Sequence, residues 1–301
     1  MKHKYVLAIG ELLVDTITNV QVDDLSQAKY LNIHPGGSAS NFCRYLSRCG
    51  TDSRLVASVG NDGFGKILLD KILLDGLSTA HISKVNDHNT SLIVVGRNSK
   101  TPDFIPYRDA DRYITDVDKE LISNASLLHT TAFSLSKDPA QTTIVEAFSE
   151  AHNQNIPVSV DWNYSEKIWA SFDDGKRVFN QLQDYSPLLK FSMDDICRFL
   201  GQRLSIQDAL NFLSSVNANL VCLTCGAEGV FYRSAQVEWR YLPAAKIVVE
   251  NATGAGDAFW AGLIHAWVEH KEVEECVQEG INTASNKLQG KLKRTVESHI
   301  K

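Results

Sequence analysis

The stretch NATGAGDAF, residues 251–259, places a carboxylate directly after three small residues, at the start of an expected helix. Gly254 and Gly256 permit backbone conformations in which successive N–H groups converge on one point. The helix adds unpaired N–H groups and the positive end of its dipole, so this turn predicts an anion site suited to a phosphoryl group. Asp257 would then lie where it can accept a proton from a hydroxyl that attacks phosphorus. The alternative, from these nine residues alone, is an ordinary helix-capping aspartate.

Neither of the two common nucleotide-binding turns describes this stretch. A Rossmann dinucleotide turn needs a third glycine where the sequence has Phe259, and too little sequence follows for a two-halved dinucleotide domain. A Walker A loop, GxxxxGK[ST], does not occur in the sequence. A dinucleotide oxidoreductase is therefore disfavoured, and binding of NAD without binding of ATP would revive it.

A second group of residues has the chemistry to bind hydroxyls. Gly36 and Gly37 give a tight turn before an expected helix, and Asn41 lies near the start of that helix. Asp15 follows an apolar strand, and ligands of open α/β sheets collect at the carboxyl ends of such strands. A turn and an early helix residue are the structural alternative to a hydroxyl site.

A third group follows another strand-like run, in the stretch TCGAEGV, residues 224–230. Its small residues Thr224, Gly226 and Gly229 let the backbone approach a phosphate closely. The same stretch contains Cys225 of a CxxC pair. That pair lies inside a strand-like run and has no second pair, so we do not interpret it as a zinc or redox site.

Strand-like and helix-like segments alternate along the chain, which predicts a mostly parallel sheet with helices on both faces. Residues 16–35 and 88–110 break this alternation, because they are β-rich or loop-like and lack crossover helices. We expect them to form a small sheet beside the main one. No linker divides the sequence, so the prediction is a single domain over residues 1–301 with this appended lid.

Composition excludes several classes of protein. The chain has 30 Lys and Arg against 36 Asp and Glu, and these cations are spread along the sequence, which argues against nucleic-acid binding. No apolar run has the length of a membrane span. The six cysteines are scattered, and several lie in apolar segments. We therefore expect a reduced, cytoplasmic protein without a membrane or nucleic-acid partner.

The motifs GELLVD, GGSASN, VGNDGFG, VDWN, TCGAEG and TGAGDAF occur in this order from about residue 5 to residue 290. Together they closely resemble the ribokinase-like (PfkB) family of carbohydrate kinases. The resemblance implies a three-layer α/β/α fold with a central, mainly parallel sheet and a small β-lid. It also implies a sugar kinase that uses ATP and Mg²⁺. Relatives often pair their lids, so we expect a homodimer through the lid, with Ile93 and Val95 of the run SLIVVG in its interface.

The resemblance assigns roles to the residues at the phosphoryl group and the sugar. Asp257 matches the family's catalytic base, and the backbone of Gly254, Ala255 and Gly256 would stabilise the transferred phosphoryl charge. The residues expected to bind the sugar are Asp15, Gly36, Gly37 and Asn41, with Tyr107 and Arg108 from the lid.

On the nucleotide side, the matching positions lie after several strands and on a late helix. The residues expected to bind ATP are Asn163, Lys190, Thr224, Gly226, Gly229, Gly254, Gly256 and Asn282. Asp195 is the expected ligand of Mg²⁺.

Three positions depart from the family pattern. Asn251 replaces an aspartate that often helps to hold a monovalent cation, which argues against a requirement for K⁺. Ser192 replaces an asparagine linked to Mg²⁺, although Asp195 keeps an oxygen ligand nearby. Ser165 replaces an arginine that pairs with the acid of keto-aldonate substrates.

The motif GELLVD is more similar to the fructokinase and 2-keto-3-deoxygluconate kinase branch than to nucleoside kinases. Because the arginine is missing at Ser165, we favour a neutral ketohexose such as fructose over a keto-aldonate. A ribose or nucleoside kinase remains an alternative. So does a catalytically silent binding protein, although its usual mark would be loss of the carboxylate that Asp257 retains.

Overall fold

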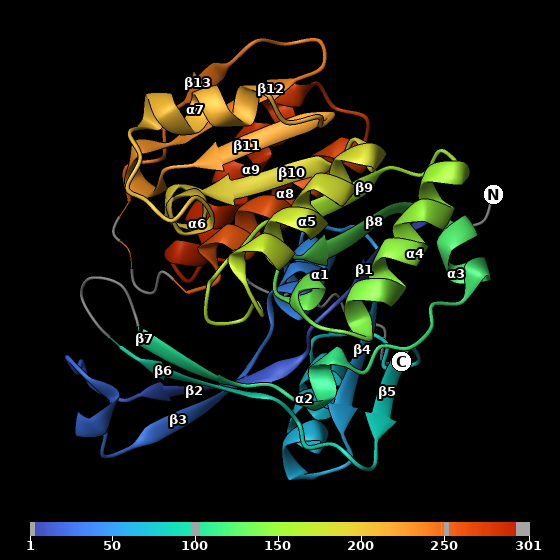
Figure 1. Ribbon diagram of the computed structural model, residues 1–301, viewed down its shortest axis with the longest axis vertical. Helices are drawn as coiled ribbons and strands as arrows, with labels where there is room; N and C mark the ends of the chain where they lie inside the picture. The colour runs from blue at the N-terminus through green and yellow to red at the C-terminus, as the bar shows by residue number, and fades with distance from the viewer. Residues whose placement is uncertain (1–3, 98–102, 248, 250–252, 293–301) are drawn as a thin grey trace.

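A central sheet crosses the molecule from β13 at one edge to β5 at the other (Figure 1). The computed structural model describes residues 4–97, 103–247, 249 and 253–292. In spatial order the strands are β13 (Arg240–Leu242), β12 (Val230–Ser234), β11 (Leu220–Thr224), β10 (Leu188–Ser192), β9 (Val158–Asp161), β8 (Ala125–Thr131), β1 (Tyr5–Ile9), β4 (Ser53–Gly60) and β5 (Ile82–Val85). The pairs from β11 to β5 are parallel, and β12 and β13 are antiparallel additions at one edge.

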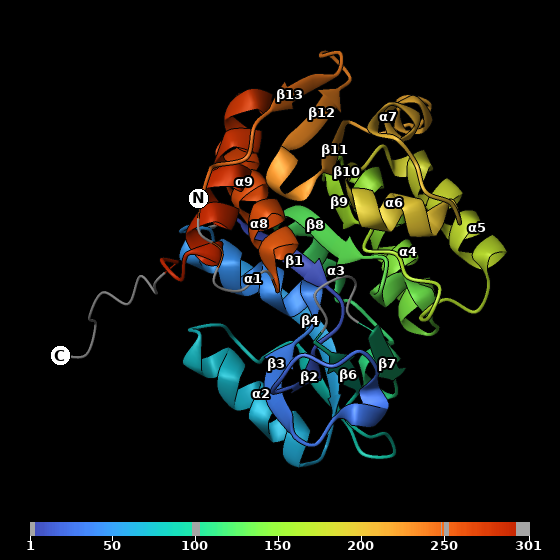
Figure 2. The same cartoon turned by 90° about the vertical axis from the view of Figure 1, so that its left-hand side faces the viewer.

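Helices cover both faces of this sheet, as Figure 2 shows in side view. One face packs on α1 (Ser38–Arg48), α2 (Gly63–Leu74), α8 (Ala255–Val268) and α9 (Val273–Leu288). The other face packs on α3 (Lys119–Ser123), α4 (Ala140–Asn153), α5 (Phe172–Leu182), α6 (Met193–Phe199) and α7 (Ile206–Ser214). Short 3-10 turns occupy Leu25–Gln27, Ala110–Arg112, Ser134–Ser136, Gln183–Tyr185 and Gly226–Glu228.

Burial on two faces explains the apolar strands of the sequence. Every residue of β1, YVLAI, is buried, because helices lie above and below the sheet. The structure confirms the predicted three-layer α/β/α fold with a mainly parallel sheet. In the part of the chain that the structure describes, no helix is both long enough and apolar enough to cross a membrane.

The expected small second sheet is present, and we call it the lid. Its strand order is β3 (Leu31–Gly36), β2 (Leu13–Thr18), β6 (Leu92–Gly96) and β7 (Asp103–Tyr107). Figure 1 shows the lid projecting at the lower left, with α2 and the strands β4 and β5 to its right. The chain passes from β1 almost directly into β2, so the lid is joined to the middle of the main sheet.

The strand register separates the lid into two faces. Asp15, Ile93 and Val95 lie on the face that borders a deep cavity. Ile33 and Ile105 lie on the opposite face, where they are 48% and 42% exposed. This geometry does not support the prediction that Ile93 and Val95 form the dimer interface, because alternation along β6 turns them toward the cavity.

Candidate active site

A cavity of about 750 Å³ lies between the lid and the carboxyl ends of the central strands. We call it the main cavity. Its lining brings together segments that are far apart in the sequence, as expected at this edge of an α/β sheet. The polar side chains and glycines that line it include Glu11, Asp15, Gly37, Ser38, Asn41, Asp161, Asn163, Lys190, Ser192, Asp195, Thr224, Gly226, Gly254, Gly256 and Asp257.

The start of α8 forms one wall of the main cavity. Gly254 caps this helix with a φ of 74°, a left-handed conformation that glycine adopts without steric cost. The first helical bond runs from the N–H of Ala258 to the carbonyl of Gly254, so the N–H groups before it have no helical acceptor. Gly254, Ala255 and Gly256 all line the cavity, and their position suits an anion.

Asp257 lies in the first turn of α8 and is 9% exposed. Asn41 of α1 donates a hydrogen bond from Nδ2 to its Oδ2 at 2.8 Å. Burial, and next the charge of Asp161, raise the pKa of Asp257 to about 7, against the opposing donor from Asn41. A carboxylate with a pKa near neutrality is suited to general-base catalysis.

Lys190 of β10 forms a buried ion pair with Asp161 of β9, with 2.7 Å between Nζ and Oδ1. The two side chains are 4% and 5% exposed. Burial alone would lower the pKa of Lys190, but the charges of Asp161, Asp195 and Asp257 outweigh it and raise the pKa. The ammonium therefore stays charged beside the start of α8. A Cβ atom on Gly256 would lie 3.3 Å from the Lys190 Nζ, so glycine leaves room for this approach.

Only some of the residues predicted to bind the sugar line the main cavity. Asp15 lines the main cavity, and burial raises its pKa to about 6, with Arg44 acting in the opposite direction. Gly37 also lines the cavity, at a φ of 97°. Gly36 does not line it, but any side chain there would collide with the Asp15 carboxylate.

Glu11 was not predicted, although it is buried in the cavity wall. Its Oε1 accepts from the Ser38 N–H at 2.7 Å, and its Oε2 accepts from the hydroxyls of Thr131 at 2.7 Å and of Ser134. Burial raises the pKa of Glu11, and these donors act against that shift. Its position directly after β1, in the same motif as Asp15, is the signal that could have found it.

Asn163 lies beside this cluster. Its Oδ1 accepts from the Phe133 N–H, and its Nδ2 donates to the Ser38 hydroxyl, both at 3.1 Å. Asn163 therefore belongs with Ser38 and Glu11 rather than with the nucleotide-side residues. The expected nucleotide contact is not supported by this position.

A second pocket of about 330 Å³ adjoins the main cavity, and we call it the adjacent pocket. Thr224 and Gly226 line both spaces, while Gly229 lines only the adjacent pocket. The other lining residues are mostly apolar and include Val230, Ile247, Phe259, Ile281, Ala284 and Leu288. A flat, apolar ligand such as a nucleobase suits this composition.

Asn282 does not reach the adjacent pocket. It lies on the exposed face of α9, where its Oδ1 accepts from Gln278 Nε2 at 3.1 Å and its Nδ2 donates to Glu279 Oε2 at 3.4 Å. The pocket-facing positions of this helix are Ile281, Ala284 and Ser285. The predicted contact of Asn282 with the nucleotide is not supported by this position, because Ile281 faces the pocket and one residue turns a side chain by about 100° around a helix.

Asp195 lies at the start of α6, in a capping box with Ser192. Its Oδ2 accepts from the Ser192 hydroxyl at 2.5 Å and from the Ser192 N–H at 3.1 Å. Burial raises its pKa to about 6. Among the residues described, no group of three or more His, Cys, Asp or Glu could hold a metal ion by itself. One cavity carboxylate together with phosphate oxygens nevertheless fits Mg²⁺, which usually binds in that way. Asn251 lies outside the described residues.

Tyr107 and Arg108 do not line the main cavity. Tyr107 lies on the outer face of the lid and is 59% exposed. Arg108 forms a buried ion pair with Asp111 at 2.6 Å, with side chains 1% and 0% exposed. It also donates to Ser136 and lies over the Phe133 ring at 4.1 Å. The prediction that these two residues bind sugar is not supported by this geometry.

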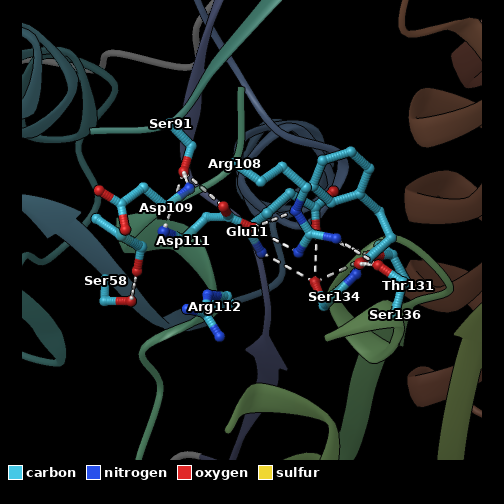
Figure 3. A network of polar contacts seen from close by, with 12 residues as sticks. Glu11, Ser58, Ser91, Arg108, Asp109, Asp111, Arg112, Thr131, Ser134 and Ser136 are labelled. Carbon is cyan, nitrogen blue, oxygen red and sulfur yellow. Dashed lines mark hydrogen bonds and ion pairs between the residues drawn. The ribbon is translucent and has the colours of Figure 1, made fainter. Parts of the chain in front are cut away.

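Figure 3 shows this arrangement at the root of the lid. Ser91, directly before β6, donates to Asp111 at 2.5 Å, and Arg108, directly after β7, completes the cluster. We call Ser91, Arg108, Asp111 and Ser136 the lid-root cluster. The charge of Arg108 is thus engaged in holding two lid strands to the main domain.

Comparison with known proteins agrees with this geometry. The model of the pfkB family carbohydrate kinases matches residues 3–298. An ATP-dependent 6-phosphofructokinase from Thermoanaerobacterium thermosaccharolyticum is 32% identical over 285 residues, covering 94% of this chain and 87% of the relative. A fructokinase from Vibrio alginolyticus is 27% identical over 255 residues, covering 81% and 82%.

Solved structures give the same result. The fructokinase of Halothermothrix orenii superimposes with a TM-score of 0.83 at 31% identity, over 93% of this chain and 98% of that one. A sugar kinase from Pyrococcus horikoshii, solved in complex with ATP, shares the fold with a TM-score of 0.80 at 21% identity, over 96% and 95%. The chain belongs to the PfkB family of carbohydrate kinases.

Proposed function

We propose that this kinase transfers the γ-phosphoryl group of ATP to a hydroxyl of a ketohexose, and that fructose is its substrate. The observation that carries the proposal is the position of Asp257. Its carboxylate lies at the first turn of α8, where unpaired N–H groups can hold a phosphoryl group, and it faces the same cavity as Asp15 of the lid.

The adjacent pocket supports a position for the ATP. Its apolar lining would hold the adenine, and the phosphates would extend past Thr224 and Gly226 toward the start of α8. Asp195 would hold Mg²⁺ together with phosphate oxygens. When bound, Mg²⁺ would neutralise charge on the transferred group.

The residues of the chain then perform two tasks. Asp257 takes the proton of the attacking hydroxyl, and its pKa of about 7 suits that transfer at neutral pH. The N–H groups of Gly254, Ala255 and Gly256 and the charged Lys190 stabilise the phosphoryl oxygens. Closure of the lid over the sugar excludes water from this region.

The charges of the main cavity support a neutral acceptor. Among the described residues, the cavity lining contains one Lys or Arg, namely Lys190, and that side chain is paired with Asp161. A carboxylate or phosphate on the sugar would need a cation of its own. Asp15 offers acceptor oxygens for sugar hydroxyls instead, and the amides of Asn41 and Asn163 line the same cavity.

Fructose 6-phosphate is the second candidate. The relative named 6-phosphofructokinase is 32% identical to this chain, slightly more similar than the fructokinase relatives described above. The two substrates differ by a phosphate dianion. The names of the relatives include both kinds of kinase, so we choose fructose from the charge of the main cavity.

A substrate panel tests the proposal. ATP consumption should be measured with fructose, fructose 6-phosphate, 2-keto-3-deoxygluconate and ribose, and we expect the highest kcat/KM with fructose. A higher kcat/KM with fructose 6-phosphate would assign the second candidate. Absence of ATP consumption with every sugar would contradict the proposed reaction, provided that ATP binding is retained in a parallel titration.

We further propose that the kinase forms a homodimer through the outer face of the lid. Ile33, Ile105 and Tyr107 expose 48%, 42% and 59% of their surface there. Pairing this face with a second copy would bury the apolar surface. The Ile105→Glu protein should therefore have half the mass of the unmodified protein in light scattering. An unmodified protein near 33 kDa, or an unchanged dimer in the variant, would contradict this interface.

A further inference from the structure

Arg44 lies one turn after Asn41 on α1 and contacts it directly. A nitrogen of its guanidinium group donates to the Asn41 Oδ1. A second nitrogen lies 3.7 Å from the Asp75 carboxylate at the end of α2. The Arg44 side chain is 13% exposed and that of Asp75 is 2% exposed, so both are largely removed from solvent.

This contact decides the orientation of the Asn41 amide. A guanidinium can only donate hydrogen bonds, and an ionised carboxylate can only accept them. Asn41 lies between the two, with Arg44 on one side and Asp257 on the other. Its oxygen must therefore face Arg44, and its NH₂ group must face Asp257.

We propose that Arg44 is a positioning residue of the kinase reaction: its guanidinium fixes the Asn41 amide so that the NH₂ group holds the Asp257 carboxylate. The inference rests on the proposed role of Asp257 as the base. Without Arg44 the amide can rotate by 180°, and its oxygen would then oppose the carboxylate. The base would lose one of its two side-chain donors, and the Ser38 hydroxyl would remain as the other.

The surroundings of Asp75 explain why Arg44 stays in place. Asp75 is also 3.6 Å from Arg48 and 2.5 Å from Lys71. Three cations from two helices thus converge on one buried carboxylate. Removal of any one of them leaves Asp75 with two, so folding does not depend on Arg44 alone. The arrangement joins α2, which packs against the lid strand β2, to the base through Arg44 and Asn41.

The donor from Asn41 also acts on the charge of the base. The other charged or titratable groups around Asp257 are Asp161 of β9, Lys190 of β10, Tyr45 of α1 and Lys287 of α9. Burial and Asp161 raise the pKa of Asp257, whereas the Asn41 donor lowers it. Turning the amide would remove that lowering effect, so more of the base would be protonated at a given pH.

The experiment compares Arg44→Met with a matched control, Arg48→Met. Each variant removes from α1 one cation that lies beside Asp75. Arg44 also donates a hydrogen bond to Asn41. We expect Arg44→Met to lower kcat by about 10- to 100-fold, the scale of a misplaced catalytic group, and to move the acidic limb of its pH profile upward. Arg48→Met should keep the wild-type kcat and pH profile. Equal losses in both variants would overturn the proposal.

A double-mutant cycle with Asn41→Ala tests whether Arg44 acts through the amide. If it does, Arg44→Met should lower kcat by less than about threefold in the Asn41→Ala background. A full loss in that background would overturn the proposal. The KM for ATP should change little in every variant, because Arg44 lines neither the main cavity nor the adjacent pocket.

Two further variants distinguish failure of this proposal from misfolding and from failure of the proposed function. Arg44→Lys preserves a cation beside Asp75 and addresses the case in which Arg44→Met does not fold. An ammonium cannot span two partners as a planar guanidinium does. We therefore expect reduced kcat, and a folded Arg44→Lys protein with wild-type kcat and pH profile would overturn the proposal. Asp257→Asn tests the base itself: if that variant retains activity, the proposed function fails whatever Arg44 does.

Discussion

Two buried ion pairs of this kinase have nearly the same geometry but different surroundings. Lys190 and Asp161 are 2.7 Å apart, with side chains 4% and 5% exposed. Arg108 and Asp111 are 2.6 Å apart, with side chains 1% and 0% exposed. The first pair lines the main cavity, whereas the second belongs to the lid-root cluster.

The difference lies in what else each cation meets. Lys190 has Asp195 and Asp257 nearby in addition to its partner, and this excess of negative charge lies beside the start of α8. Arg108 is satisfied by Asp111, Ser136 and the ring of Phe133. Burial and pairing are therefore alike in the two pairs. The surplus of carboxylates around Lys190 is the feature that separates the proposed catalytic cation from the structural one.

The largest effect should come from replacing Asp257, the carboxylate near the ion pair of Lys190 and Asp161. Asp257→Asn removes the proposed base and preserves the size of the side chain. We expect kcat to fall by about 10²–10⁴-fold with sugar binding largely kept, in line with general-base contributions. Steady-state kinetics and a binding titration with the sugar measure the two quantities. Near-wild-type turnover would remove Asp257 from the mechanism.

Replacing the two cations by methionine separates their roles. Arg108→Met leaves Asp111 buried without its cation, so the free energy of unfolding should fall by about 3–5 kcal/mol. The protein that remains folded should keep kcat/KM within about tenfold, because Arg108 does not reach the main cavity. Lys190→Met should also reduce stability, but its folded fraction should lose kcat as well.

Denaturant unfolding and active-site-normalised kinetics give both quantities for each variant. If Arg108→Met lowered kcat/KM of the folded protein by much more than tenfold, the lid-root pair would have a role in substrate binding. If folded Lys190→Met kept its kcat, the cavity pair would be structural too. Either result would break the distinction between them.

Asp15 tests the sugar end of the cavity with a smaller expected effect. Asp15→Ala removes a charged acceptor for hydroxyls, a loss of about 1.5–3 kcal/mol. The KM for sugar should rise roughly 10- to 150-fold, while the KM for ATP should stay unchanged. A rise in the KM for ATP alone would show that the two ends of the cavity are reversed.

The last test of the comparison is the pH dependence. Burial raises the pKa of Asp257 to about 7, and protonation abolishes its ability to accept a proton. We expect kcat to fall about tenfold per pH unit below that pKa. The contribution of Asp257 to the free energy of unfolding should change in the opposite direction to kcat. A pKa above the usual 3.8 means that the folded state binds this proton more tightly, so the contribution is fully present below pH 3.8 and is lost as the pH rises to about 7. A kcat that is flat from pH 7 to pH 5 would contradict the assignment.

The parts of the site that lie within one continuous motif were predictable. The turn before Asp257 and the early helix position of Asn41 follow from local glycine and helix signals, and both reach the main cavity. The fold was predictable for the same reason, since alternating strands and helices are a local pattern. The lid also appeared in the sequence, as two segments without crossover helices.

The remaining roles depend on contacts that sequence spacing does not reveal. Asp161 matters through Lys190, which belongs to another strand, and Arg44 matters through the packing of α1 against α2 and α8. Arg108 follows directly on a lid strand, but the turn after β7 directs it into the domain instead of the cavity. Asn282 was predicted to contact the nucleotide, but it lies one helical position after the pocket-facing Ile281.

The hydrogen bond between Asn41 and Asp257 joins residues that are 216 positions apart. During synthesis of the chain, α1 emerges early, but α8 and α9 follow much later and cover the same face of the sheet. A nascent chain that has not yet released α8 therefore has no assembled base, and one apolar face of its sheet is only partly covered. Ribosome-bound intermediates should thus be inactive as kinases and dependent on chaperones until α8 and α9 dock.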